Sequence, residues 1–139
     1  MSPRSLIAFD FGLKHIGVAT GQNITKTASP LCILKAKEGQ PNWQQVDDIL
    51  QQWQPDLVIV GLPLNMDGSV SEMSKRAMKF ANRVHGRFGV AVETVDERLS
   101  SYEAKGEVIE HHQTRDFGSN TVDAIAAQLI LQSWFNQQN

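Results

Sequence analysis

The sequence has few of the features that mark secreted or membrane-bound proteins. A single cysteine, Cys32, excludes an internal disulfide framework and favours a reducing compartment. No apolar run approaches the roughly 18 residues that a membrane-spanning helix needs. The first residues also lack the apolar core of a signal peptide. We therefore expect a cytoplasmic protein with no membrane partner.

An excess of one charge is also missing. The 13 basic and 15 acidic residues give a formal net charge of -2, so the chain lacks a global nucleic-acid signature. Any binding of nucleic acid must then come from local patches. The 139 residues suffice for a substantial hydrophobic core, and no internal repeat or long linker divides them. We expect a single domain over residues 1–139.

Hydrophobic patterning predicts an α/β fold. Three β-rich runs predict an antiparallel meander over 6–9, 16–21 and 24–34, and further strands are predicted over 57–60 and 90–95. A first helix is predicted over 41–54, and a second runs from a Ser69/Glu72 capping box to Phe88. A third is predicted from Ser100 to about His111. After a loop over 114–120, the last helix is predicted from Thr121 to about Asn136. In the order β-β-β-α-β-α-β-α-α, helical crossovers predict parallel pairing of the later strands. We expect a mixed five-stranded sheet with helices on both faces.

Acidic residues occur where three predicted elements would face one edge of this sheet. Asp10 ends the first strand, Asp96 and Glu97 follow the fifth, and Asp123 lies in the first turn of the last helix. Functional crevices of such sheets lie at the carboxyl ends of strands. Taken singly, each acid also has a structural explanation, as a turn residue, a rim charge paired with Arg98, or a partner of the helix dipole. Together they favour a shared site.

Carboxylates a few ångströms apart repel one another, and a divalent cation removes that cost. Oxygen-only ligation suits Mg²⁺ or Mn²⁺, and the sequence shows no Cys/His cluster of the kind that holds zinc. The acids therefore predict a site for a hard divalent cation.

Four segments carry a resemblance to a known family. They are Asp-Phe-Gly-Leu-Lys-His-Ile-Gly-Val-Ala (10–19), Gly-Leu-Pro-Leu-Asn-Met-Asp-Gly (61–68), Asp-Glu-Arg-Leu-Ser (96–100) and Val-Asp-Ala-Ile-Ala-Ala (122–127). In this order, and over nearly the whole chain, the sequence resembles the YqgF family, also called RuvX, of the RNase H-like superfamily. The resemblance implies an RNase H-like (RuvC-like) fold. It also implies a metal-dependent nuclease that matures the 5′ end of pre-16S rRNA, with Holliday junction resolution as an alternative by analogy.

The resemblance also implies which acids form the site. By motif position Asp10, Glu97 and Asp123 are the catalytic and metal-binding triad. We expect Asp10 to bridge two divalent ions roughly 3.5–4 Å apart, with Glu97 and Asp123 each holding one of them. One ion would activate water and the other would stabilise the leaving oxygen. Related resolvases carry a further acid at the position of Ala126, and many family members carry a Lys where residues 119–121 are Ser-Asn-Thr.

Positive charge for substrate binding gathers in one predicted helix. Between residues 70 and 88 there are five Lys or Arg and one acid, and four of the five are spaced three, four and four residues apart, on one helical face. A solvated stripe and a phosphate-binding face explain this spacing equally well. Lys14 and Arg98, beside the acids, are the stronger candidates for phosphate contacts. The predicted substrate-binding residues are Lys14, Arg76, Lys79, Arg83 and Arg98.

Other functions stay open at this point. Asp-x-Gly before a hairpin also occurs in actin-like ATPases and sugar kinases, but those folds need two such domains. A non-catalytic nucleic-acid-binding module, acting in transcription or ribosome assembly, is compatible with the modest charge and with Ala126. Structured RNA, with pre-16S rRNA favoured, is the expected partner, and branched DNA is the alternative. Trp134 and Phe135 are candidates for a self-association surface, although Trp134 is better explained as core.

Overall fold

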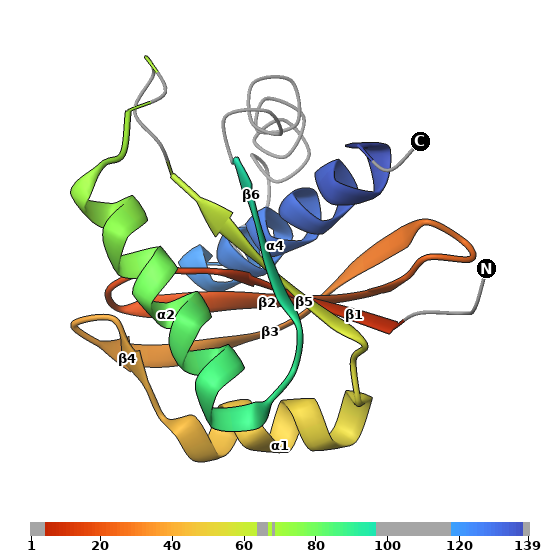
Figure 1. Cartoon of the computed structure of the whole chain (residues 1–139), viewed down its shortest axis with the longest axis horizontal. Helices are drawn as coiled ribbons and strands as arrows, with labels where there is room; N and C mark the ends of the chain where they lie inside the picture. The colour runs from red at the N-terminus through yellow and green to blue at the C-terminus, as the bar shows by residue number, and fades with distance from the viewer. Residues whose placement is uncertain (1–4, 64–66, 68, 97–117, 138–139) are drawn as a thin grey trace.

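The protein is organised around a six-stranded sheet with the strand order β4-β3-β2-β1-β5-β6 (Figure 1). The computed structural model describes residues 5–63, 67, 69–96 and 118–137, with side chains from residue 124 onward in the last range. The strands are β1 (Ser5–Asp10), β2 (His15–Gln22), β3 (Thr27–Lys37), β4 (Gln40–Pro41), β5 (Leu57–Leu62) and β6 (Val92–Asp96). The helices are α1 (Trp43–Trp53), α2 (Glu72–Phe88) and α4 (Gly118–Gln137).

Strand pairing follows the predicted order, with one addition. β1, β2 and β3 form the antiparallel meander, and β1, β5 and β6 pair in parallel. The addition is β4, a two-residue strand that pairs with the end of β3 and gives the sheet six strands where five were predicted. The turn before it depends on Glu38 and Gly39, which have positive φ values of 52° and 83°. Neither residue of β4 is a strong strand former, so the pattern did not reveal it.

The sheet has a hydrophobic cluster on each face. Along β1, Ile7 and Phe9 belong to the cluster beneath α1 and α2, whereas Leu6 and Ala8 belong to the cluster beneath α4. This alternation is that of a strand with both faces buried. In Figure 1, α2 crosses in front of the strands and α4 lies behind them. The prediction of helices on both faces is therefore confirmed. We call the two faces the α2 face and the α4 face.

The start of α2 differs from the predicted capping box. Its N-cap is Ser71, whose Oγ accepts a hydrogen bond from the Ser74 amide at 3.0 Å. Ser69 instead turns toward Asp67, because its amide and hydroxyl both donate to Asp67 Oδ1, at 2.9 and 2.6 Å. The helix therefore begins at Glu72, which places that acid in the first turn, where the helix dipole favours it.

The last helix begins earlier than predicted. α4 starts at Gly118, so residues 118–120 of the predicted loop are helical. The rest of that loop and the helix predicted from Ser100 lie outside the described residues. Trp134 and Phe135 are 7% and 2% exposed in the cluster on the α4 face, so neither offers a self-association surface. Within the described residues, no helix has the length and apolarity needed to cross a membrane.

Candidate active site

Three parallel strands end side by side at one edge of the sheet. Phe9 pairs with Val60 and Leu62 pairs with Asp96, so the ends of β1, β5 and β6 are level on adjacent strands. The structure places Asp10 at the end of β1 and Asp96 at the end of β6, both half-buried. Two of the predicted acids therefore lie at the carboxyl edge, where ligands bind to open α/β sheets.

The two acids face opposite sides of the sheet. Asp10 continues the row of Leu6 and Ala8, so it lies on the α4 face. Asp96 follows Val95, which is buried in the cluster on the α4 face, so alternation puts Asp96 on the α2 face. This register separates Asp96 from the face that carries Asp10.

Space beside Asp10 comes from a glycine. In the β1–β5 register, Asp10 is one residue beyond Phe9, which pairs with Val60, so it lies level with Gly61. Gly61 is itself level with Val95 of β6. Gly61 therefore places no side chain beside Asp10 in the row across the strand ends. A carboxylate oxygen at a strand end is the kind of ligand that suits a hard divalent cation such as Mg²⁺ or Mn²⁺.

The position of α4 brings a second predicted acid toward this edge. The Gln128 and Gln132 side-chain amides donate to the carbonyl oxygens of Ala28 and Lys26, at 2.8 and 3.3 Å. These bonds fix the later turns of α4 over the β2–β3 connection, and Figure 1 shows its first turns on the side where β1 and β5 end. Asp123 lies within these first turns of α4.

The rest of the predicted acidic triad is not described. Glu97 and Arg98 lie outside the described residues, as does the side chain of Asp123. Among the side chains that are described, no three Asp, Glu, His or Cys residues gather closely enough to hold a metal. The structure thus gives the place of Asp10 and the helical position of Asp123, and the triad as a whole stays a prediction.

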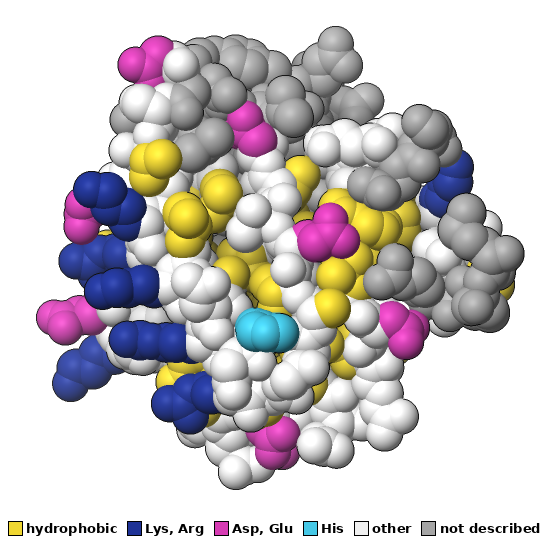
Figure 2. Space-filling view, in the orientation of Figure 1, with side chains coloured by type: hydrophobic (Ala, Val, Ile, Leu, Met, Phe, Trp, Pro, Cys, Tyr) yellow, Lys and Arg dark blue, Asp and Glu magenta, His cyan; other side chains and the backbone are white. Residues whose placement is uncertain are grey.

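A groove on the α2 face collects most of the predicted substrate-binding cations. We call it the α2 groove; its volume is about 360 Å³, and it is lined by Phe11, Glu38, Gly39, Gln40, Glu72, Lys75, Arg76, Lys79, Phe80 and Arg83. Figure 2 shows Lys and Arg side chains gathered along this side of the molecule. Arg76, Lys79 and Arg83 therefore share one concave surface. Lys14 is exposed in the β1–β2 turn and does not line the groove.

The floor of the groove begins next to Asp10. Phe11 follows Asp10 directly, and its ring lies 5.6 Å from that of Phe80, centroid to centroid. Phe80 in turn stacks on Trp43 at 5.8 Å and meets Phe9 edge-on at 5.3 Å. Sequence reasoning missed Phe11 and the Glu38–Gln40 turn as parts of this surface. Only the hydrophobic character of Phe11 and the glycine at position 39 hinted at them.

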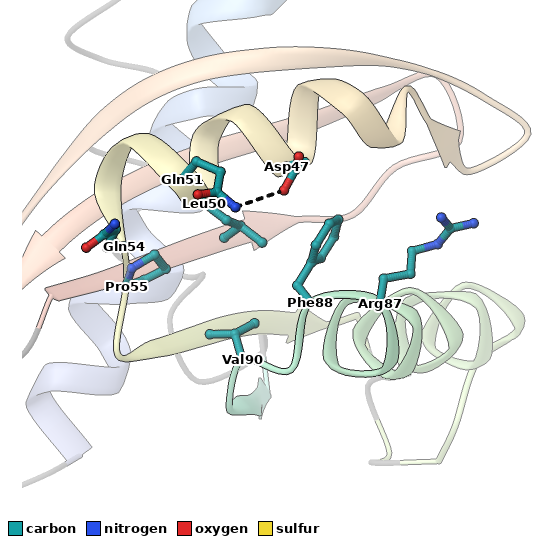
Figure 3. Close-up of a pocket in the computed structure, with 8 residues that line it drawn as sticks. All are labelled: Asp47, Leu50, Gln51, Gln54, Pro55, Arg87, Phe88 and Val90. Carbon is teal, nitrogen blue, oxygen red and sulfur yellow. Dashed lines mark hydrogen bonds between the residues drawn. The ribbon is translucent and has the colours of Figure 1, made fainter.

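A second cavity lies at the other end of the strands. It has a volume of about 450 Å³ and is lined by Asp47, Leu50, Gln51, Gln54, Pro55, Arg87, Phe88 and Val90 (Figure 3). Pro55 precedes β5 and Val90 precedes β6, so this cavity is at their amino ends. Arg87 takes part here, with its guanidinium carbon 4.4 Å from the centroid of Trp43. Although its spacing matches the other α2 cations, Arg87 is therefore absent from the α2 groove.

The single thiol has no catalytic environment. Cys32 is half-buried in β3, and burial raises the pKa of its thiol. A raised pKa leaves little thiolate at neutral pH, and the thiolate is the nucleophilic form. The candidate chemistry therefore rests on the carboxylates.

The family follows from comparison with known proteins. The model of a family described as "RuvX: Holliday junction resolvase" matches residues 4–137. The chain belongs to the RuvX family. A protein of Pectobacterium atrosepticum, named "Putative pre-16S rRNA nuclease", is 56% identical over 139 residues, which cover 100% of both chains. A relative of the same name from Marinobacter nauticus is 56% identical and covers 97% of this chain and 94% of its own. The family and these relatives place this RuvX chain among nucleases, enzymes that hydrolyse phosphodiester bonds.

Solved structures show the fold of this RuvX chain. RuvC of Thermus thermophilus, in complex with a Holliday junction substrate, aligns with a TM-score of 0.58 at 16% identity, covering 97% of this chain and 95% of its own. The Holliday junction resolvase of fowlpox virus aligns with a TM-score of 0.56 at 19% identity, covering 96% and 99%. The predicted RNase H-like, RuvC-like fold is therefore confirmed.

Proposed function

We propose that this protein is a metal-dependent nuclease that acts in the cytoplasm on the 5′ end of pre-16S rRNA. The observation that carries the proposal is the placement of Asp10, a half-buried carboxylate at the end of β1, one residue from the floor of a cationic groove. The name shared by relatives that are 56% identical supports the RNA substrate. The family description and the resolvase neighbours support branched DNA as the second candidate.

The acids would bind the metal, and the cations would bind the substrate. In this proposal Asp10, Glu97 and Asp123 hold Mg²⁺ or Mn²⁺ through their carboxylate oxygens, as their oxygen-only chemistry favours. Such ions supply Lewis-acid stabilisation and an activated water when they are bound. Asp10 is held in place by β1, which is paired on both sides and buried up to Phe9. That rigidity orients the carboxylate before substrate arrives.

The cations would bind the phosphates of the substrate. A carboxylate triad alone repels phosphate, so a nuclease must bring positive charge to its substrate. Arg76, Lys79 and Arg83 are exposed along one groove, and we assign them to the phosphates of the substrate backbone. Lys14, in the turn after Asp10, and Arg98 would contact phosphates nearer the point of cleavage.

A cleavage assay tests the proposal. End-labelled pre-16S 5′ leader RNA and a four-way DNA junction would each be incubated with Mg²⁺, Mn²⁺ or EDTA. Wild-type protein would be compared with Asp10→Asn and with Asp48→Asn, which alters an exposed acid of α1. We expect metal-dependent cutting of the leader RNA that falls at least ~10³-fold in Asp10→Asn and is unchanged in Asp48→Asn.

Other outcomes would redirect the assignment. Cutting of the junction alone would establish the resolvase in place of the rRNA nuclease. Binding of both substrates without cutting of either would favour the non-catalytic module. Full activity of a clean Asp10→Asn preparation would remove Asp10 from the catalytic site.

A further inference from the structure

The α2 groove has two chemically different walls. The α2 wall presents four cations, Lys75, Arg76, Lys79 and Arg83, and one acid, Glu72, all exposed. The opposite wall is the turn before β4, with the exposed side chains of Glu38 and Gln40. Within the described part of the chain, no carboxylate forms an ion pair with any of these four cations. The groove therefore has positive charge on one side and hydrogen-bonding groups on the other.

The wall that carries Glu38 is held in a fixed position. The Gly39 amide donates to the carbonyl oxygen of Leu13 at 2.9 Å, and the Ala36 amide donates to that of Lys14 at 2.8 Å. Gly39 has a φ of 83°, and a Cβ there would lie 2.7 Å from Phe11 Cζ, so the turn sits directly on the Phe11 ring. Glu38 itself has a φ of 52°, a conformation that a side-chain-bearing residue adopts only when its surroundings require it. These contacts tie the wall to the turn that follows Asp10.

The dimensions and floor of the groove restrict what it can hold. Its volume of about 360 Å³ is that of a cube about 7 Å on a side. The major groove of B-DNA alone is about 12 Å wide, so the space can hold one sugar–phosphate strand but does not enclose a duplex. Phe11 and Phe80 are only 8% and 2% exposed, and they offer no open ring for base stacking. Recognition in this groove must therefore use phosphates and sugars.

We propose that the α2 groove binds one strand of RNA, with its phosphates against Lys79 and Arg83 and its ribose 2′-hydroxyls against Glu38 and Gln40. This inference rests on the proposed function, because it takes a nucleic acid as the substrate. A 2′-hydroxyl can donate to the Glu38 carboxylate and can either donate to or accept from the Gln40 amide. DNA has no such hydroxyl, so a DNA strand would bring its phosphates near an uncompensated carboxylate.

A binding assay without metal tests the predicted preference of the groove for RNA over DNA. Fluorescence anisotropy would be measured in EDTA with a labelled 12-nucleotide single-stranded RNA and with DNA of the same sequence. We expect wild-type protein to bind the RNA about 10-fold more tightly, as one or two hydrogen bonds to a charged group imply. In Glu38→Ala this ratio should fall below about 3-fold, because the carboxylate acceptor is lost. The matched control is Glu93→Ala, an exposed acid of β6 outside the groove, which should leave the ratio unchanged.

The cationic wall is tested separately. Lys79→Ala and Arg83→Ala should weaken the binding of RNA and DNA equally, and each should reduce the slope of log affinity against log salt by about 1. Lys35→Ala, which changes an exposed cation of β3 outside the groove, should alter neither quantity. Thermal unfolding would establish that each variant is folded, and Gln40→Ala would replace Glu38→Ala if the latter is not.

Three results would overturn the inference: equal wild-type affinity for RNA and DNA, an unchanged ratio in Glu38→Ala, or tighter binding of duplex RNA than of the single strand. Cleavage of the leader RNA in the presence of metal would be measured alongside binding. This second assay distinguishes failure of the groove inference from failure of the proposed nuclease function. If the leader RNA is cleaved but the protein binds RNA and DNA equally tightly, only the inference about the groove is rejected. An RNA preference that depends on Glu38, without any cleavage, would reject the nuclease alone.

Discussion

The two faces of the sheet differ in the side chains that pack on them. On the α2 face, the rings of Phe9, Phe11 and Trp43 each contact the ring of Phe80, and the helices pack on this aromatic cluster. On the α4 face, the strands contribute small side chains, among them Ala8, Ala19 and Ala28, and α4 contributes Ala127. Small side chains let the helix approach the strands closely at these positions, although Trp134 and Phe135 of α4 belong to the same cluster. The α2 face, in contrast, leaves room for a groove.

Two consecutive residues of the chain connect these faces. Asp10 lies on the α4 face, and Phe11 forms part of the floor of the α2 groove. Because neighbouring residues of an extended chain point to opposite sides, one peptide bond separates the proposed metal site from the proposed substrate site. At the end of this one strand, the proposed metal site therefore lies on the α4 face and the proposed substrate site on the α2 face.

The largest effects should separate chemistry from binding. Asp123→Asn, in α4, should lower kcat for cleavage of the leader RNA by at least ~10²-fold with little change in KM. Arg83→Ala, on the α2 face, should raise KM by about 10-fold and leave kcat close to that of wild type. Steady-state kinetics with Mg²⁺ checks both. If kcat fell as much in Arg83→Ala as in Asp123→Asn, catalysis and substrate binding would not be assigned to separate faces.

Loss of an aromatic ring should destabilise the α2 face strongly. Phe80 is 2% exposed and contacts three other rings, so Phe80→Ala should lower the free energy of unfolding by about 3–5 kcal/mol. Urea unfolding followed by circular dichroism measures the change. Phe88→Ala, at a partly buried ring of the same cluster, should cost clearly less. Equal losses for the two variants would show that the layer does not depend on Phe80.

The α4 face should instead be sensitive to added volume. A Cβ at Gly21 would lie 2.5 Å from the Thr27 carbonyl oxygen and 2.8 Å from Leu131 Cδ2, so Gly21→Ala should cost about 1–3 kcal/mol. At Gly86, within α2, nothing lies within 4 Å of such an atom, and Gly86→Ala should stabilise the protein by about 0.5–1 kcal/mol. Thermal unfolding of both variants checks the contrast, and a stabilised Gly21→Ala variant would contradict close packing of α4.

The smallest effect concerns the start of α2, which leads to the groove. Ser71→Ala removes the N-cap acceptor for the Ser74 amide and should cost about 1 kcal/mol. Ser69→Ala, at the position that sequence reasoning assigned to the cap, should cost less than about half of that, because the Ser69 amide and hydroxyl donate to Asp67, in the turn before the helix. Chemical unfolding of both variants would decide which serine caps the helix.

Much of the fold could be predicted because alternation and helical spacing are local patterns. The run Leu57–Val60 predicted a strand buried on both faces, and the crossovers predicted parallel pairing of the later strands, as seen between β5 and β6. The cap at Ser71 was missed because Ser69 also precedes Glu72 at capping-box spacing, and only the contact with Asp67 shows where Ser69 turns. The two residues of β4 carry no periodicity at all.

The site was less predictable because it depends on contacts between distant residues. The placement of Asp10 at a strand end followed from the end of an apolar run. The face of Asp96, in contrast, depends on the register of β6 against β5, which the sequence does not encode locally. The wall formed by Glu38 and Gln40 depends on a turn that closes onto Phe11, some 27 residues earlier in the chain. Hydrophobic patterning alone carries no information on that closure.

The anchoring of α4 also sets an order of events during synthesis. Its Gln128 side chain binds the backbone of Ala28, 100 residues earlier, whereas the β1–β2–β3 meander joins neighbours in sequence. At ribosomal rates of about 5–20 residues per second, the two partners are made roughly 5–20 s apart. During that interval α4 is not yet present to cover the face of the sheet that carries Leu6, Ala8 and Ile59. Because Asp123 is made with the same helix, the proposed metal-binding acids would be complete only after all six strands of the sheet have been synthesised.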